Sequence, residues 1–239
     1  MIQLPFAVSD KKITINPSKI IAVGLNYMDH VKESRTFGNN PLEVPVEPIL
    51  FAKTPNVLIG PGEAIVIPDH IKDYKFQNPR VDPEAELAII IAKRCRHVPA
   101  EKAYDYVLGY TCFNDVSQRN LQKSNVSGWF RSKSFDTFGP IGPVIVSHND
   151  IGDPQALGLF CRINGVTRQS GNTNDMIFSI PVLISFISKQ FTLEEGDIIA
   201  TGTPAGVSPI APGDTVEIEV EKIGVLRNPV VMEKSTTSP

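Results

Sequence analysis

Residues 81–92 read VDPEAELAIIIA, an acidic stretch followed directly by an apolar run. The run from Leu87 to Ala92 is continuous, which favours a strand that is buried on both faces. In an extended backbone, successive side chains point to opposite faces, so Glu84, Glu86 and Ala88 share one face. Two carboxylates therefore lie at one end of a buried strand, where they repel each other and are poorly solvated. We expect a positive group beside them.

Strand signals on either side of this segment outnumber helix signals. Two turns between apolar runs predict β-hairpins: PGE within 49–68, and Asn164-Gly165 leading into 166–168. Residues 1–18 are expected to form a short N-terminal hairpin or arm. Further strands are expected at 20–24, 87–92, 110–113, 139–146, 157–163, 197–200 and 215–220.

Helix signals are few. Residues 99–108 predict a helix with Pro99 in its first turn, and 176–189 predict another. The polar segment 26–35 has helical spacing but is too short to form a stable helix alone. Because many strands combine with few helices and no regular βαβ alternation, we expect an α+β, mostly β fold, a mixed β-sandwich roll with peripheral helices.

Composition indicates one globular domain, placed at 19–232 after the arm and before a disordered tail at 233–239. Hydrophobic residues make up 41% of the chain and charged residues 21%, which is ordinary for globular proteins. A net charge of -3 and a pI near 5.8 argue against a nucleic-acid partner. The longest apolar stretch, 176–188, is too short to span a bilayer, and the N-terminus lacks a signal peptide. We therefore expect a cytoplasmic protein without a membrane partner.

The three cysteines do not form a metal or redox motif. Cys95, Cys112 and Cys161 are widely spaced, and no CxxC pair occurs. The alternative to a nucleophilic role for Cys95 or Cys112 is that of a small buried apolar residue, which is the far commoner use of a single cysteine.

A third carboxylate, Asp115, follows the predicted strand 110–113. Together with Glu84 and Glu86 it would give an all-oxygen site, which suits Mg²⁺ or Mn²⁺ rather than zinc. Three protein ligands leave about three octahedral positions, two of which a 2-oxo acid can fill. The competing reading is that Glu-x-Glu is simply a solvated face of a strand. Residue spacing alone does not decide between the two.

Blocks of the chain from Lys19 to Pro229 resemble the fumarylacetoacetate hydrolase superfamily, within it the acylpyruvase, oxaloacetate decarboxylase and heptadienedioate isomerase branch. This resemblance implies a mixed β-sandwich roll, a homodimer, and one Mg²⁺ or Mn²⁺ per chain held by Glu84, Glu86 and Asp115. The matching blocks are VGLNYMDHVKE (23–33), PILFAKTPNVLIGPGEAIVIP (48–68), DPEAELAIII (82–91), GYTCFNDVSQRNLQ (109–122), RSKSFDTFGPIGP (131–143) and MIFSIPVLISFISKQFTLEEGDIIATGTPAGV (176–207).

His30 and Glu33 are one helical turn apart, so the carboxylate can orient the imidazole and raise its pKa. A surface pair of this kind is common, but the resemblance assigns the two residues to a catalytic dyad on a mobile lid, expected at about 27–40. His70, His97 and His148 match no site of the family and are expected at the surface.

Five further residues complete the expected site. Arg119 and Gln122 follow Asp115 at helical or turn spacing and are expected to bind substrate. The resemblance implies that Lys133 is an active-site lysine, whose ammonium would stabilise an enolate or oxyanion. It also implies that the loop with Gly202 and Thr203 holds the substrate through backbone and hydroxyl contacts. Without that resemblance, solvated side chains are the commoner reading.

Three enzymatic reactions share these residues. The first expectation is a hydrolase that cleaves the C–C bond of 3-acylpyruvate-type 2,4-dioxo acids. The alternatives are an oxaloacetate decarboxylase and a 2-hydroxyhepta-2,4-diene-1,7-dioate isomerase of aromatic catabolism. All three pass through an enolate, so the residues next to the substrate do not separate them. The distal end of the substrate would be read by loops at 37–46 and 125–130. A non-catalytic binding protein is disfavoured, because His30, Glu33 and Lys133 are all present.

Overall fold

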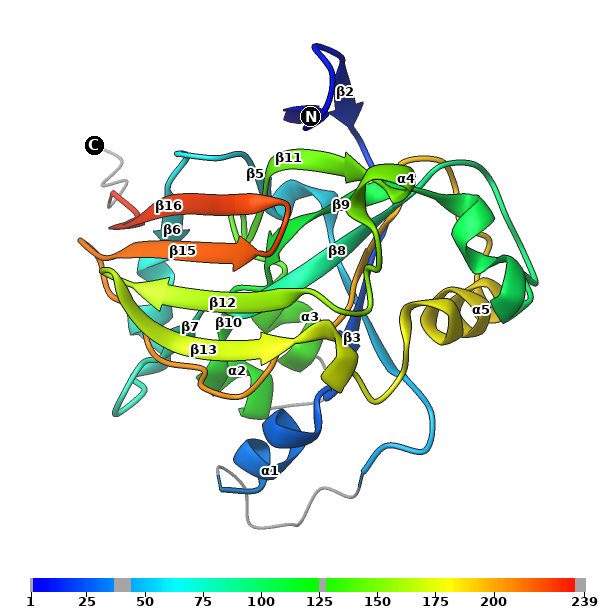
Figure 1. Cartoon of the computed structure of the whole chain (residues 1–239). Coiled ribbons are helices and arrows are strands. Elements are labelled where there is room, and N and C mark those ends of the chain that lie inside the picture. Colours follow the sequence, from blue (N-terminus) through cyan, green and yellow to red (C-terminus); the bar gives the residue numbers. More distant parts are fainter. Residues whose placement is uncertain (1, 37–43, 125–127, 235–239) are drawn as a thin grey trace.

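Two β-sheets carry most of the protein, whose computed structural model describes residues 2–36, 44–124 and 128–234. The sheets pack face to face, and helices lie around their edges (Figure 1). This arrangement confirms the predicted fold class, a mostly β, mixed sandwich roll with few peripheral helices.

The larger sheet holds the quoted segment at its centre. Strand β8 (Ala85–Ile91) lies between two other strands and is buried along its whole length, as its continuous apolar run predicts. The order of this seven-stranded sheet is β4 (Ile49–Lys53), β3 (Ile20–Gly24), β14 (Ile198–Ala200), β8, β9 (Val107–Asn114), β11 (Gly139–Ser147) and β5 (Leu58–Ile59).

The two edge strands of this sheet, β4 and β5, follow each other in the chain. Only residues 54–57 separate them, and this connection spans at most about 17 Å. In a flat sheet, the first and seventh strands would lie about 29 Å apart. The sheet must therefore curl until its edges approach each other, and this curl brings the end of β4 close to the end of β9.

The smaller sheet has five strands and packs against one face of the larger one, the face that carries Leu87 and Ile89. Its strands β12 and β13 form the predicted hairpin at Asn164-Gly165, where φ is 52° and 77°. Both values are positive, as a two-residue type I′ hairpin turn requires. The strand order is β13 (Val166–Asn172), β12 (Gly158–Ile163), β15 (Thr215–Val220), β16 (Gly224–Met232) and β6 (Ile65–Ile67).

Alternate residues of β8 enter two separate cores. Leu87 and Ile89 point into the main core between the sheets, which also contains the buried face of helix α5 (Ile180–Gln190). Ala88 and Ile90 point to the opposite face, which the N-terminal hairpin covers. That hairpin consists of β1 (Ile2–Pro5) and β2 (Lys12–Ile15).

The PGE turn corrects one prediction. It joins β5 to β6, but these strands belong to different sheets, because β5 pairs with β11 and β6 pairs with β16. Gly62 has a φ of 80°, and its amide donates to the carbonyl oxygen of Arg227 at 2.9 Å. The turn therefore carries the chain from one sheet to the other instead of closing a hairpin.

Two helix predictions also change. Residues 99–108 do not form an α-helix: Ala100–Tyr106 form 3-10 turns, and β9 begins directly afterwards. The second helix, α5 (Ile180–Gln190), begins later than predicted, because Met176 instead pairs with Tyr27 in an isolated bridge. Pro181 lies in the first turn of α5, where a missing N–H removes no intrahelical bond.

Short helices border the end of β8 where the acidic residues lie. They are α1 (Met28–Thr36), α2 (Arg119–Ser124) and α3 (Gly128–Lys133); α4 (His148–Ile151) lies elsewhere, beside β9 and β11. Within the described ranges, no helix is long and apolar enough to cross a membrane.

The predicted C-terminal tail is described only in part. The amide of Glu233 donates to the carbonyl oxygen of Ile67 at 2.9 Å, and residues 235–239 lie outside the described part.

Candidate active site

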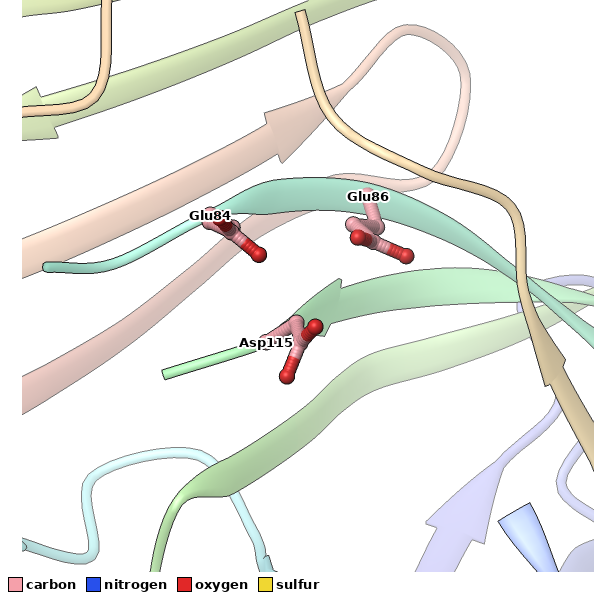
Figure 2. Close-up of side chains that lie close together, drawn as sticks. All are labelled: Glu84, Glu86 and Asp115. Atoms are coloured by element: carbon pink, nitrogen blue, oxygen red, sulfur yellow. The ribbon is translucent and has the colours of Figure 1, made fainter. Parts of the chain in front are cut away.

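Three carboxylates meet where β8 begins and β9 ends. The ladder pairs Ala85 with Asn114, and just beyond it the amide of Asp115 donates to the carbonyl oxygen of Glu84 at 3.0 Å. Glu86 lies two residues farther along the same face of its strand, so the three side chains converge (Figure 2). One ligand oxygen from each lies within 4.8 Å of the others, and all three residues are buried. The predicted acidic triad therefore comes together in space.

The chemistry of the triad fits a hard divalent cation. Its donors are all carboxylate oxygens, the ligands that Mg²⁺ and Mn²⁺ prefer over softer metals. Burial raises the pKa of Glu86 well above its usual range, and the charges of Asp115 and Glu84 raise it further. A cation among the three carboxylates would relieve this repulsion, so these residues suit the ion that the sequence predicts.

Lys133, the last residue of α3, lies between two carboxylates of the triad. Its Nζ donates to Glu84 Oε2 at 2.7 Å, to Ser117 Oγ at 2.8 Å and to Asp115 Oδ2. Burial lowers the pKa of Lys133, but the charges of Asp115 and Glu84 outweigh it and raise the pKa above its usual value. The side chain is therefore a fixed ammonium at the site, as the sequence predicts.

A second buried lysine, Lys53, reaches the site from the end of β4. Its side chain is fully buried, and its Nζ donates to Asp115 Oδ1 at 2.7 Å. The same ammonium also contacts the carbonyl oxygen of Val116 at 3.4 Å and that of Lys133. Burial lowers the pKa of Lys53 more than Asp115 raises it. Sequence reasoning missed this residue, although it ends the apolar run ILFAK as a charged residue.

Arg119 approaches Glu84 from the other side. Its Nη2 donates to Glu84, its Nε to Asp82 Oδ2 at 2.8 Å, and its Nη1 to Gln122 Oε1 at 3.0 Å. Burial raises the pKa of Glu84, but the charges of Arg119 and Lys133 hold it well below its usual range. Arg119 and Gln122 thus lie at the site as predicted, with the guanidinium holding a triad carboxylate.

His30 and Glu33 form the predicted pair on α1. His30 Nδ1 and Glu33 Oε2 are 3.0 Å apart, and the amide of Gly206 donates to Glu33 Oε1 at 3.0 Å. Burial raises the pKa of Glu33, but the bonds from His30 and Gly206 outweigh it and lower the pKa below its usual value. The carboxylate is therefore ionised and held on both oxygens.

The loop 201–206 connects this pair to the triad. At one end, the amide of Gly202 donates to Glu86 Oε2 at 2.9 Å, and at the other end Gly206 contacts Glu33. Gly202 has a φ of 96°, and a Cβ there would meet the Cβ of Asn26 at 2.8 Å, so only glycine fits. The amide of Gly202, expected to contact substrate, thus holds a triad carboxylate, while Thr203 lies beside it and is 3% exposed.

The remaining predictions concern residues away from this cluster. His70 and His97 are exposed, whereas His148 is half-buried with its Nδ1 3.0 Å from the hydroxyl of Tyr110. All three cysteines are buried and form no disulfide, which agrees with their interpretation as small buried apolar residues. Part of the predicted lid, 37–40, and parts of the two substrate loops, 37–43 and 125–127, lie outside the described residues.

Comparison with known proteins places this site in a family. The family profile "Fumarylacetoacetate (FAA) hydrolase C-terminal" matches residues 19–231. The mitochondrial oxaloacetate tautomerase FAHD2A of Homo sapiens is 40% identical over 223 residues, which cover 90% of this chain and 67% of that protein.

Two solved structures of similar proteins share the fold. One is 5-carboxymethyl-2-hydroxymuconate delta-isomerase from Mycobacterium smegmatis, with 38% identity, a TM-score of 0.80, and coverage of 95% of this chain and 87% of that one. The other is maleylpyruvate hydrolase from Sphingobium sp. SYK-6 in complex with manganese(II) and pyruvate, with 36% identity, a TM-score of 0.75, and coverage of 91% and 72%. With its sequence, fold and acidic triad in agreement, the chain belongs to the fumarylacetoacetate hydrolase family.

Proposed function

We propose that this protein is a divalent-metal-dependent enzyme that acts on small 2-oxo acids, with hydrolysis of 3-acylpyruvates as its first candidate reaction. The observation that carries the proposal is the convergence of Glu84, Glu86 and Asp115 beside a buried ammonium and a His–Glu pair. The three carboxylates would hold one Mg²⁺ or Mn²⁺. Such an ion acts as a Lewis acid toward the oxo and carboxylate oxygens of a 2-oxo acid. The manganese and pyruvate in the structure of the Sphingobium hydrolase support this choice of ion and ligand.

The charges around the triad favour an anionic substrate. Three carboxylates alone would leave a divalent ion with a formal charge of minus one, which does not attract anions. Cations surround the triad, however, and offset this charge. The buried or half-buried network around the triad contains four carboxylates and four cationic side chains, so a bound divalent ion would give the network a positive net charge. Its members are Asp82, Glu84, Glu86, Asp115, Lys53, Arg80, Arg119 and Lys133.

In hydrolysis of a 3-acylpyruvate, His30 acts as the general base. Glu33 accepts the Nδ1 proton of the neutral ring, so that Nε2 takes a proton from water. The water oxygen attacks the distal carbonyl, the C–C bond to C3 breaks, and its electron pair stays with the pyruvate fragment as an enolate. Lys133 stabilises the developing negative charge, because an ammonium fixed before the reaction needs no reorganisation. Protonation of C3 then yields pyruvate and a carboxylic acid.

Tautomerisation of oxaloacetate is the second candidate, because curated relatives of 40–42% identity are oxaloacetate tautomerases. This reaction needs a base that moves a proton between C3 and the enol oxygen, but it needs no attacking water. Decarboxylation of oxaloacetate and isomerisation of a dienedioate would use the same ammonium and pass through the same type of enolate. The isomerase structures among the similar proteins support the latter.

A substrate panel tests the proposal. Acetylpyruvate, oxaloacetate, fumarylpyruvate and a heptadienedioate are incubated with the purified protein and Mg²⁺ or Mn²⁺, and both substrate loss and products are followed. Acid and pyruvate released from an acylpyruvate support hydrolysis, whereas faster interconversion of the keto and enol forms of oxaloacetate supports tautomerisation. Failure to turn over any of the four with either ion would contradict the proposal.

A further inference from the structure

Gln169 joins two parts of the site from the opposite sheet. It lies on β13, is 1% exposed, and accepts the amide of Ala85 on its Oε1 at 2.9 Å. Its Nε2 donates to Thr203 Oγ1 at 2.7 Å and to the carbonyl oxygen of Pro204 at 2.7 Å. Ala85 separates the two glutamates of the triad, and Thr203 belongs to the loop 201–206. One buried amide therefore ties the triad strand to this loop.

The orientation of this amide is fixed by its partners. Ala85 offers an N–H, which only the carbonyl oxygen of Gln169 can accept. Pro204 offers a carbonyl oxygen, which only the NH₂ group can bind. A rotation of the amide by half a turn would place donor against donor and acceptor against acceptor. The NH₂ group therefore faces the hydroxyl of Thr203.

This orientation sets the direction of the Thr203 hydroxyl. Because Oγ1 accepts from Gln169, its own proton points away from that amide and is available as a donor. Within the described part of the chain, this hydroxyl donates no hydrogen bond to another residue. The neighbouring amide of Gly202 bonds to Glu86, so Thr203 directly follows the point where the loop touches the triad.

The backbone of the loop has little freedom to change this geometry. A Cβ at Gly206 would lie 2.0 Å from the carbonyl oxygen of Arg168, and one at Gly171 would lie 2.7 Å from Pro204 Cβ. The loop thus packs directly on β13 on both sides of Gln169. With Oγ1 of Thr203 held by the amide of Gln169, rotation about the C–O bond sets where the hydroxyl proton points.

We propose that Gln169 is a positioning residue that turns the Thr203 hydroxyl into a hydrogen-bond donor for an oxygen of the anionic substrate. This inference rests on the proposed function, since it needs a carboxylate or oxo group at the triad. Without Gln169, the carbonyl oxygen of Pro204 loses its donor and competes for the Thr203 proton. Gln169 then affects ligand binding only through Thr203, without touching the ligand itself.

The test is the affinity for oxalate, measured by calorimetry in saturating Mn²⁺. Wild type is compared with Thr203→Val, Thr203→Ser, Gln169→Met and the double variant Gln169→Met/Thr203→Val. Gln155→Met is the matched control, because Gln155 uses its amide in the same way, accepting from Ile180 at 2.9 Å and donating to Thr173, but contacts no residue of the triad or the loop. Circular dichroism establishes that each variant is folded.

We expect Thr203→Val to weaken oxalate binding about tenfold or more, because a hydrogen bond to an anion is lost. Gln169→Met should weaken oxalate binding when Thr203 is present, but should weaken it little further in a protein that already carries Thr203→Val. The Thr203→Ser and Gln155→Met variants should bind oxalate with the affinity of wild type. Unchanged binding in Thr203→Val, or effects of the two variants that simply add, would overturn the role of Gln169. Wild type that fails to bind oxalate in Mn²⁺ would instead overturn the proposed function, and with it this inference.

Discussion

Replacing Lys53 by methionine removes a charge from the centre of the site while keeping an unbranched side chain that is one atom shorter. Its ammonium is fully buried and contacts Asp115, Val116 and the main chain of Lys133. Removing one partner of a buried ion pair costs about 3–5 kcal/mol, because the other charge stays buried. Asp115 keeps its contact with Lys133, which places the expected loss near the lower end. A domain stable by about 5–15 kcal/mol should still fold.

Urea unfolding in EDTA measures this loss, with Lys19→Met as the matched control. Lys19 also pairs with a buried carboxylate, Asp197, but is partly exposed, and Asp197 keeps bonds from the amides of Ser18 and Glu194. Such a pair is worth about 1 kcal/mol or less. We expect Lys53→Met to lower the unfolding free energy by about 3 kcal/mol or more, several times the effect of Lys19→Met. Equal effects of the two variants would refute the view that Lys53 compensates a buried charge.

Three further predictions follow from the geometry. Burial and two neighbouring carboxylates raise the pKa of Glu86, so this residue destabilises the fold as the pH rises above the ordinary pKa of a glutamate. In EDTA, Glu86→Gln should therefore raise the free energy of unfolding at neutral pH and have little effect on it below about pH 4. An effect of Glu86→Gln that does not change with pH would argue against this. His30→Ala should lower acetylpyruvate hydrolysis by about 10²–10⁴-fold while sparing oxaloacetate decarboxylation, and equal losses in both assays would make His30 a positioning residue. Lys133→Met should raise the oxalate inhibition constant about tenfold or more and lower kcat with it, whereas unchanged inhibition would place the lysine outside the pocket.

Local patterns predicted those parts of the fold that local physics determines. The continuous apolar run predicts β8 because a strand buried on both faces has no polar face to alternate with. Asn164-Gly165 predicts its hairpin because both residues accept a positive φ at low cost. The alternation of a strand likewise put Glu84 and Glu86 on one face, and the triad confirms it.

Non-local contacts account for what was missed. Strand β16 has no clear signal, since Asn228-Pro229 interrupts its apolar pattern; the Asn228 side chain is buried because it donates to the carbonyls of Gly60 and Glu63 in another loop. The PGE turn has the residues of a hairpin, and only the pairing of its two strands with distant partners shows otherwise.

The same limit applies to the site. Lys53 ends β4 and Asp115 directly follows β9, two strands that are four places apart in the sheet order, so only the curl of the sheet brings the two residues into contact. Gln169 lies on the opposite sheet, and nothing in its surrounding sequence indicates a contact with Ala85. Arg119 was expected to bind substrate. Its bonds to Asp82 and Glu84 were not foreseen, because they depend on the register of β7 (Val81–Asp82) with β10 (Ser117–Gln118).

The dependence of acetylpyruvate and oxaloacetate turnover on a divalent ion tests the central claim most directly. The purified protein is assayed with Mg²⁺ or Mn²⁺, after exhaustive EDTA treatment, and after the ion is restored, with Asp115→Asn as a folded variant that lacks one ligand charge. We expect turnover to vanish in EDTA, to return with the ion, and to stay near zero in Asp115→Asn. Full activity after EDTA treatment, or in Asp115→Asn, would contradict a metal-dependent site at Glu84, Glu86 and Asp115.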